Sequence, residues 1–214
     1  MQDCIGVYLH GFLSSGNSEK GQWLKSKVKQ NSSCFKDVYT PTYPIASPQA
    51  SVEEINRCIQ HALSLSSKVI LLGSSMGGYY AQYFGQKYAI PYIMINPALN
   101  PTPIFTQNLG SHINPATEEA FCIDAAYIEA IQSFNFSDLQ QNIPALLLLD
   151  TDDEVIDVEF ALQRYAQSYV KSHECKAGID QNSKFESIIF TGGDHRFIHM
   201  DTAWLDIQAF AERL

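Results

Sequence analysis

The sequence lacks any long hydrophobic run, and it has few basic residues. Its two longest aliphatic stretches, residues 69–72 and 145–149, are far shorter than the ~20 apolar residues that span a bilayer. Against 14 Lys and Arg stand 23 Asp and Glu, which gives a formal charge of −9. This balance disfavours nucleic acid or an anionic membrane as a partner, because both attract basic surfaces. No basic leader precedes the first apolar segment, so we expect neither secretion nor a membrane span.

Cysteine is scarce as well. Five cysteines are scattered over 214 positions, and no two of them form a Cys-x-x-Cys pair. An odd number without paired spacing argues against a disulfide framework and against a zinc ribbon. We therefore expect free thiols in a reducing, cytoplasmic compartment.

Short apolar segments alternate with longer segments of helical periodicity, which predicts a single α/β domain over residues 1–214. Strands are predicted at 4–9, 35–39, 68–72, 92–95, 145–150 and 185–190, and helices at 18–30, 49–65, after 73–78 to about 87, 157–170 and 201–214. The alternation predicts a mainly parallel sheet with helices on both faces. Ser51 with Glu54 three residues later predicts a capping box for the second helix.

One stretch, residues 97–142, separates two predicted strands by far more than the usual connection length. Three prolines in its first part predict a loop up to residue 114, and the pattern of residues 115–132 predicts a helix. An insertion of this length above a sheet is a candidate lid over a site. The alternative is a surface excursion without a role.

The segment Gly73-Ser74-Ser75-Met76-Gly77 matches the pattern Gly-x-Ser-x-Gly. It lies between an aliphatic strand and a helix, which is the position of a nucleophile elbow. A nucleophile there occupies a sharp, strained turn, and glycines two residues to either side let strand and helix approach each other. Only Ser75 has a glycine on both sides at this spacing, so Ser75 is the predicted nucleophile.

A serine hydroxyl needs a base that removes its proton. The six histidines are His10, His61, His112, His173, His195 and His199. His195 follows a Gly-Gly pair directly after the last predicted strand, from where it can reach over the sheet edge toward Ser75. His199 is its competitor, but it lies at the start of the last helix and lacks the glycine loop. We predict His195 as the base.

A carboxylate must orient that base, and several acids follow the strand at 145–150. Physical reasoning leaves Asp150, Asp152 and Asp153 open, since each is equally suited to be a solvated turn residue. The chain order of serine, acid and histidine is nevertheless that of the α/β hydrolases.

The loop after the first strand reads His10-Gly11-Phe12. We predict that the backbone N–H groups of Phe12 and of Met76, the residue after the nucleophile, hold the oxyanion that forms during acyl transfer. His10 is predicted to brace this loop and not to act as a second base.

Four segments together resemble the small bacterial YqiA-like esterase family: His-Gly-Phe-x-Ser-Ser at 10–15, Gly-Ser-Ser-x-Gly-Gly-Tyr-Tyr at 73–80, Asp-Glu-Val at 153–155 and Gly-Gly-x-His at 192–195. The resemblance covers nearly the whole chain, and least so residues 102–134. It implies a compact α/β-hydrolase fold and hydrolysis of short acyl esters or thioesters. It assigns the nucleophile to Ser75, the base to His195 and the acid to Asp153. The chain departs from the family at Asp152, where glycine is usual, and at Asp194, where asparagine is commoner.

The sequence therefore predicts a serine esterase that hydrolyses short-chain acyl esters through a Ser75–His195–Asp153 triad and an acyl-enzyme. Its predicted partner is a small acyl ester, it needs no metal or organic cofactor, and its oligomeric state is left open. An acyl-CoA or acyl-carrier thioesterase with the same triad is the alternative among enzymes. From a different class, the alternative is a catalytically silent hydrolase fold that serves as a binding protein.

Overall fold

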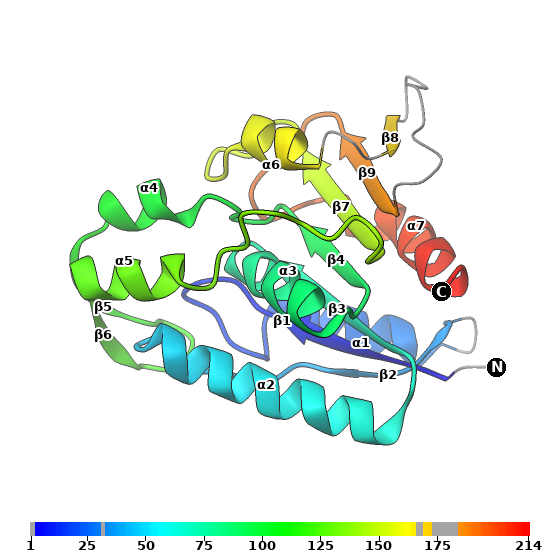
Figure 1. Cartoon of the computed structure of the whole chain (residues 1–214), viewed down its shortest axis with the longest axis horizontal. Helices are drawn as coiled ribbons and strands as arrows, with labels where there is room; N and C mark the ends of the chain where they lie inside the picture. The colour runs from blue at the N-terminus through cyan, green and yellow to red at the C-terminus, as the bar shows by residue number, and fades with distance from the viewer. Residues whose placement is uncertain (1–2, 31–32, 166–168, 173–183) are drawn as a thin grey trace.

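The computed structural model describes residues 3–30, 33–165, 169–172 and 184–214 (Figure 1). Within these residues, seven strands form one sheet in the order β2-β1-β3-β4-β7-β9-β8, and each pair of neighbours is parallel. The strands are β1 (Cys4–Leu9), β2 (Phe35–Tyr39), β3 (Val69–Ser74), β4 (Tyr92–Ile95), β7 (Ala145–Asp150), β8 (Tyr169–Ser172) and β9 (Phe185–Phe190).

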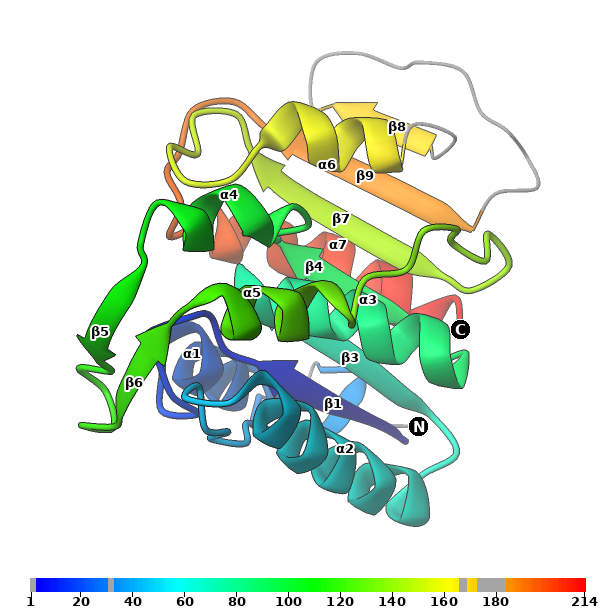
Figure 2. The same ribbon diagram turned by 60° about the vertical axis from the view of Figure 1, so that its left-hand side comes forward.

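Helices cover both faces of this sheet. One face carries α1 (Glu19–Val28) and α7 (Met200–Glu212), and the other carries α2 (Pro48–Leu65), α3 (Met76–Tyr88) and α6 (Val158–Arg164) (Figures 1 and 2). Successive strand residues point to opposite faces, so Leu71 packs into the core under α2 and α3 while Leu72 packs under α1 and α7. Burial on both faces explains why β3 is an unbroken aliphatic run. The predicted fold class is confirmed.

The start of α2 differs from its prediction. Ser47 caps the helix by accepting a hydrogen bond from the N–H of Ala50, and Pro48 occupies the first turn, where a missing N–H costs nothing. Ser51 instead lies inside the helix, and its hydroxyl donates back to the carbonyl oxygen of Ser47 at 3.2 Å. The capping box predicted from Ser51 and Glu54 is therefore wrong.

The insertion also differs from its prediction. It contains a short helix α4 (Pro101–Thr106), an antiparallel hairpin of β5 (Gly110–Ile113) and β6 (Ala120–Ile123), and then α5 (Ala125–Gln132). The helix predicted from residue 115 begins only after Asp124, whose carboxylate caps it by accepting from the N–H of Tyr127. Pro101 opens α4, a position that tolerates proline, so the prolines there do not exclude a helix.

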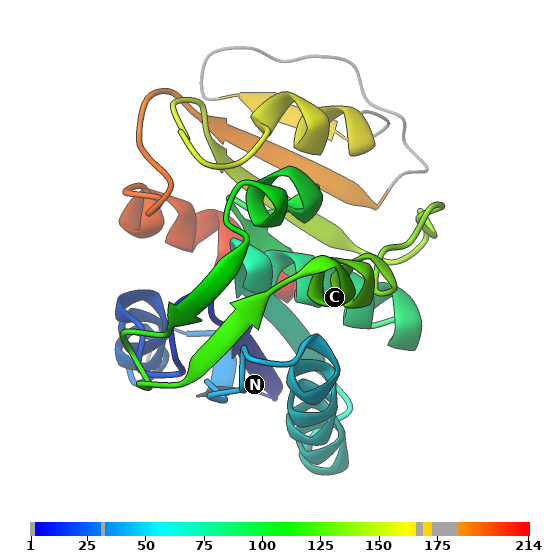
Figure 3. The same cartoon turned by 90° about the vertical axis from the view of Figure 1, so that its left-hand side faces the viewer.

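The insertion lies at the carboxyl ends of the strands, and the hairpin projects beyond them (Figures 2 and 3). The Glu119 carboxylate, in the turn of the hairpin, accepts hydrogen bonds from the N–H groups of Ile45 at 2.9 Å and Ala46 at 3.3 Å. The Asn114 side-chain amide donates to the carbonyl oxygen of Ser14 at 3.0 Å. The hairpin is thus attached to the loop after β1 and to the loop before α2.

Two further boundaries differ from the prediction. The helix predicted over 157–170 ends at Arg164, residues 166–168 lie outside the described residues, and Tyr169–Ser172 forms β8 beside β9. The strand predicted over 68–72 continues to Ser74. His173 and Cys175 lie outside the described residues, and the other four cysteines are free. Among the described helices, none combines the length and apolar character that crossing a bilayer requires.

Candidate active site

Ser75 occupies the turn between β3 and α3 with φ 56° and ψ −122°, a backbone conformation that residues other than glycine rarely adopt. The turn is closely packed. A Cβ added at Gly73 would lie 2.0 Å from the carbonyl oxygen of Gly77, and one at Gly77 would lie 2.0 Å from that of Leu9. The two glycines therefore let strand, turn and helix approach one another, and Ser75 projects from the apex.

The structure brings Ser75, His195 and Asp153 together. Nε2 of His195 lies 3.0 Å from the Ser75 hydroxyl oxygen, and its Nδ1 lies 2.8 Å from Oδ2 of Asp153. Burial raises the pKa of Asp153, but hydrogen bonds from His195 and from the N–H groups of Ile156 and Val155 outweigh burial and hold the pKa below its usual value. Asp153 is thus a carboxylate that accepts a hydrogen bond from the Nδ1–H group, which leaves the Nε2 lone pair directed at the serine.

The other two candidate acids take no part in the hydrogen bonds that join Ser75, His195 and Asp153. Asp150 is fully buried, and its Oδ1 lies 2.7 Å from Nδ1 of His199. Asp152 is exposed and accepts a hydrogen bond from the hydroxyl of its neighbour Thr151. The described residues therefore contain two carboxylate–imidazole pairs, and of these two the Asp153 pair has a serine on its far side.

The Asp150–His199 pair was not foreseen from the sequence, although a signal for it exists. Gly192 and Gly193 have φ values of 79° and 85°, which only glycine adopts without strain. A Cβ at Gly193 would lie 2.0 Å from Oδ2 of Asp150. The Gly-Gly pair before His195 thus marks the place where the loop passes over the buried Asp150 carboxylate.

The buried side chain of Asn96 and the exposed carboxylate of Glu154 fix the position of the His195 loop. The side-chain amide of Asn96, at the end of β4, donates to the carbonyl oxygen of Asp194 at 3.0 Å. Its Oδ1 accepts from the N–H of Asp150 at 2.9 Å. The Glu154 carboxylate accepts from the N–H of His195 at 3.1 Å. Ends of three neighbouring strands therefore hold the imidazole in front of Ser75.

The loop after β1 passes close to the nucleophile, since a Cβ at Gly11 would lie 3.3 Å from Cβ of Ser75. Met76 is the first residue of α3, so its N–H has no carbonyl partner within the helix. Among the described residues, neither this N–H nor that of Phe12 donates a hydrogen bond. Two N–H donors beside a nucleophile and without acceptors form the kind of site that stabilises an oxyanion.

His10 contacts the loop and not the nucleophile. Its Nδ1 donates to the carbonyl oxygen of Gly11 at 2.8 Å, and its ring stacks on Tyr43 with 3.9 Å between centroids. The Tyr43 hydroxyl donates to the His10 carbonyl oxygen. Burial lowers the pKa of His10 to about 4, so the ring is neutral at physiological pH.

Two hollows lie beside the turn of Ser75: Ser75 itself lines one of them, and its neighbour Met76 lines the other. The small cavity has a free volume of about 10 Å³ and is lined by Gly11, Phe12, Tyr43, Ile45, Ser51, Met76, Tyr80 and Tyr127. The open cleft has a volume of about 240 Å³ and is lined by Tyr8, Gly11, Phe12, Ser14, Ser18, Glu19, Lys20, Ser74, Ser75, His195 and Arg196. The two hollows differ in chemistry, because only the open cleft contains charged side chains and the imidazole.

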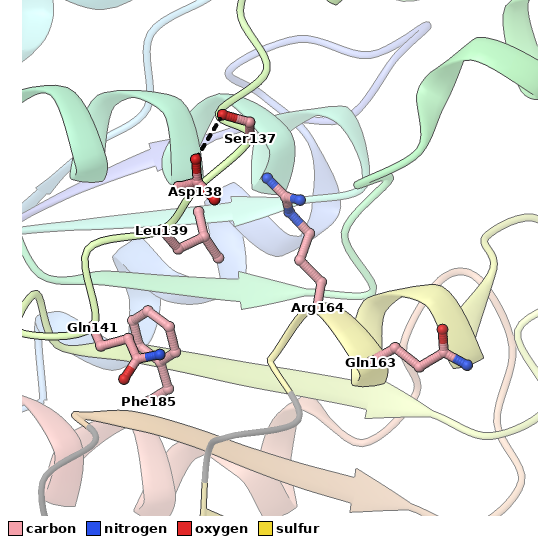
Figure 4. A pocket seen from close by; sticks show the side chains of 7 residues that line it. All are labelled: Ser137, Asp138, Leu139, Gln141, Gln163, Arg164 and Phe185. Atoms are coloured by element: carbon pink, nitrogen blue, oxygen red, sulfur yellow. Dashed lines mark hydrogen bonds between the residues drawn. The ribbon is translucent and has the colours of Figure 1, made fainter.

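A further hollow of about 360 Å³ lies at the amino end of β9, whose first residue, Phe185, lines it (Figure 4). Its described lining includes Arg164, Asp138, Gln163 and Phe185, but no histidine. Among the described lining residues, Ser137 is the one serine, and no base lies beside it as His195 lies beside Ser75.

Sequence comparison finds relatives across most of the chain. A protein-family model described as "Uncharacterised protein family (UPF0227)" matches residues 5–212. The UPF0227 protein YcfP of Salmonella gallinarum is 28% identical over 187 residues, which are 85% of this chain and 91% of that protein. A UPF0227 protein of Pectobacterium carotovorum is 27% identical over the same shares of the two chains.

Solved structures share the fold at low sequence identity. A structure described with LipS and LipT, two metagenome-derived lipolytic enzymes, superposes with a TM-score of 0.68 at 13% identity and covers 100% of this chain and 95% of its own. Est1E from Butyrivibrio proteoclasticus superposes with a TM-score of 0.63 at 15% identity, covering 99% and 87%. The chain therefore has the α/β-hydrolase fold of these esterases.

Proposed function

The chain belongs to the UPF0227 family, and from the geometry around Ser75 we propose that it is a serine esterase acting on short-chain carboxylic esters. The observation that carries the proposal is the contact chain from Ser75 through His195 to Asp153, with distances of 3.0 and 2.8 Å. A strained elbow, a base and an orienting carboxylate are the parts that acyl transfer to serine requires. The esterase and lipolytic descriptions of its structural neighbours support the same reaction class.

In the first half of the proposed reaction, the Ser75 oxygen attacks the ester carbonyl carbon while Nε2 of His195 takes the hydroxyl proton. The imidazolium that results is stabilised by the carboxylate of Asp153. The negative charge that develops on the carbonyl oxygen is held by the N–H groups of Phe12 and Met76. When the tetrahedral intermediate collapses, the bond to the alcohol oxygen breaks, and His195 gives its proton to that oxygen.

In the second half, water hydrolyses the acyl-enzyme. His195 takes a proton from the water as the water oxygen attacks the acyl carbonyl carbon. The same two N–H groups hold the second oxyanion, and collapse breaks the bond to Ser75, whose oxygen recovers the proton from His195. The products are one carboxylic acid and one alcohol, and no step uses a metal or organic cofactor.

The small cavity supports a short acyl group. Its free volume of about 10 Å³ is close to the ~10–15 Å³ that a single water needs, so it has room for little more than a methyl group without rearrangement. Tyr127 of the insertion closes it, and the Tyr127 hydroxyl is fixed by donating to the carbonyl oxygen of Ile45 at 2.8 Å.

We also propose that the insertion covers the site. The Phe12 ring meets Phe105 of α4 and Phe121 of β6 edge to face, with centroids 5.0 and 5.4 Å apart. The insertion therefore packs directly on the loop that supplies one oxyanion donor. Movement of the insertion would change access to that donor, which is the property of a lid.

A fluorophosphonate probe tests the proposal. Wild type, Ser75→Ala and Ser74→Ala are labelled and mapped by peptide mass spectrometry. We expect an adduct on Ser75 in wild type and in Ser74→Ala, and none in Ser75→Ala. A folded wild type that takes no label would overturn the proposal and favour a binding protein with a silent hydrolase fold.

A further inference from the structure

The open cleft places two cations beside the nucleophile and the base. Lys20 is the second residue of α1, and Arg196 follows His195 directly in its loop. Both line the cleft together with Ser75 and His195. The overall charge of −9 does not suggest such a pair of cations, so its location in this cleft is informative.

Lys20 is half-buried, and no described carboxylate forms an ion pair with its ammonium group. Burial lowers the pKa of Lys20, which reflects the cost of removing an ammonium from water without a partner. By contrast, Lys27 on the same helix pairs with Asp201 at 2.8 Å. The Lys20 ammonium is thus a half-buried cation without a described anionic partner.

The acids around Lys20 are engaged elsewhere or exposed. Asp194 accepts hydrogen bonds from the Arg196 guanidinium at 3.2 and 3.3 Å, and Asp150 pairs with His199. Glu19 lines the cleft but is exposed to water, where its charge is screened. Arg196 is itself exposed, with 82% of its side chain accessible, so its guanidinium can also contact a ligand at the rim.

The side of Ser75 on which these cations lie decides which part of an ester they meet. The leaving alcohol must receive its proton from Nε2 of His195, so it lies on the imidazole side, in the open cleft. We assign the acyl group to the small cavity, which is lined by the two donor residues Phe12 and Met76 and whose described lining carries neither the imidazole nor a charged side chain.

We propose that the substrate is an ester whose alcohol part carries a carboxylate or phosphate group, and that Lys20 and Arg196 bind this anion. The inference rests on the proposed esterase function and adds the chemistry of the alcohol. A second hollow of about 340 Å³ shares Lys20 and Arg196 with the cleft and continues over Trp23 and Ile198. This hollow is also lined by the carboxylates of Glu19 and Asp201, of which Asp201 pairs with Lys27 at 2.8 Å. The remainder of the alcohol therefore meets a mixed surface, in which Trp23 and Ile198 offer apolar contact.

Matched acetyl esters test this inference. The anionic substrates are para-acetoxybenzoate and para-acetoxyphenyl phosphate, which separate carboxylate from phosphate, and the neutral reference is para-acetoxybenzamide. A succinate monoester of para-nitrophenol, compared with the neutral butyrate, places the anion on the acyl side. Each is measured with wild type, Lys20→Met and the control Lys25→Met, which removes a lysine of the same helix that does not line the cleft.

We expect wild type and Lys25→Met to prefer at least one anionic acetyl ester over the amide by about tenfold in kcat/KM, the effect of one charge-assisted contact. Lys20→Met should lose that preference while it retains the rate on the amide, and added salt should weaken the preference in wild type. The succinate monoester of para-nitrophenol, whose anion is on the acyl side, should not be preferred over the butyrate.

The outcomes separate the two proposals. If wild type hydrolyses para-acetoxybenzamide as fast as the anionic acetyl esters, the inference is overturned and the esterase proposal stays intact. The same holds if Lys20→Met lowers kcat/KM equally for all esters. Absence of turnover on every ester by folded wild type contradicts the esterase proposal itself. Circular dichroism of each variant establishes that it is folded.

Discussion

Asp150 and His199 form a second carboxylate–imidazole pair next to the one in the candidate site, with 2.7 Å between Oδ1 and Nδ1. Oδ2 of Asp150 also accepts hydrogen bonds from the N–H groups of Asp194 at 3.3 Å and Ile198 at 3.2 Å. These two residues flank His195 in the chain. Asp150 therefore holds the loop of His195 from both sides, while Asp153 contacts the His195 imidazole itself.

The first prediction separates these two acids by activity. Asp153→Asn keeps the shape of the site but no longer favours the imidazole tautomer with its proton on Nδ1, so kcat should fall about 10⁴-fold. Its unfolding free energy should change little by comparison. Steady-state kinetics and urea unfolding measure the two effects. Near wild-type kcat in this variant would remove Asp153 from the triad.

The second prediction concerns Asp150→Asn. This change replaces the buried carboxylate that accepts hydrogen bonds from His199 and from the N–H groups of Asp194 and Ile198, and we expect it to lower the unfolding free energy by about 3 kcal/mol. We expect kcat to fall less than in Asp153→Asn, because the contacts of His195 with Ser75 and Asp153 remain. Urea unfolding and kinetics on the same preparation test both parts. A larger loss of kcat in Asp150→Asn than in Asp153→Asn would exchange the two assignments.

The third prediction is a pH dependence of stability from His10. Burial lowers its pKa in the folded protein to about 4, against 6.5 for an unperturbed histidine. Between these values the unfolded chain binds more protons, so stability is fully present above pH 6.5 and declines as pH falls toward 4. The loss from His10 between pH 7 and 5 is about 2 kcal/mol.

His10→Asn tests this origin, because its side-chain amide can replace the Nδ1 donor but does not titrate. Urea unfolding at pH 7 and pH 5 should show a smaller difference for His10→Asn than for wild type. Equal differences in the two proteins would assign the pH dependence to other groups.

The fourth prediction concerns acyl-chain length. Tyr127→Leu removes part of the wall of the small cavity, so butyryl esters should gain over acetyl esters. Two further methylene groups are worth about 1.6 kcal/mol when buried, or roughly a tenfold rise in the ratio of kcat/KM. Tyr83→Leu, on α3 and outside the cavity, is the control and should keep the wild-type ratio. An unchanged ratio in Tyr127→Leu would place the acyl group elsewhere.

The fifth prediction compares matched oxygen and sulfur esters, since a thioesterase would use the same triad. We expect kcat/KM for an acetyl oxygen ester to be comparable with that for the sulfur ester of the same acyl group. A large preference for sulfur would replace the esterase proposal by a thioesterase.

The strands were predictable wherever burial on both faces imposes an aliphatic sequence. Residues 92–95 and 145–150 are such cases, and the structure has strands with those bounds. The hairpin of β5 and β6 gave no comparable signal, because its strands are four residues long and alternate between exposed and less exposed positions. The helix predicted over residues 115–132 reflects the periodicity of α5, which begins ten residues after the predicted start.

Ser75 and His195 could be singled out as candidate residues because the turn that holds each of them requires nearby glycines. Gly73 and Gly77 fix the turn of Ser75, and Gly192 and Gly193 fix the loop of His195. The acid was not predictable from the residues alone. Several acids follow β7 within one turn, and only the three-dimensional path of the chain decides which one meets Nδ1.

The separation of Ser75 and His195 along the chain has a consequence during synthesis. Ser75 precedes His195 by 120 positions, and the loop of His195 is held by the ends of β4, β7 and β9. A ribosome therefore synthesises the turn of Ser75 long before it releases His195. Under the proposed function, the nascent chain is inactive until β9 has docked, so esterase activity would report that the sheet is complete.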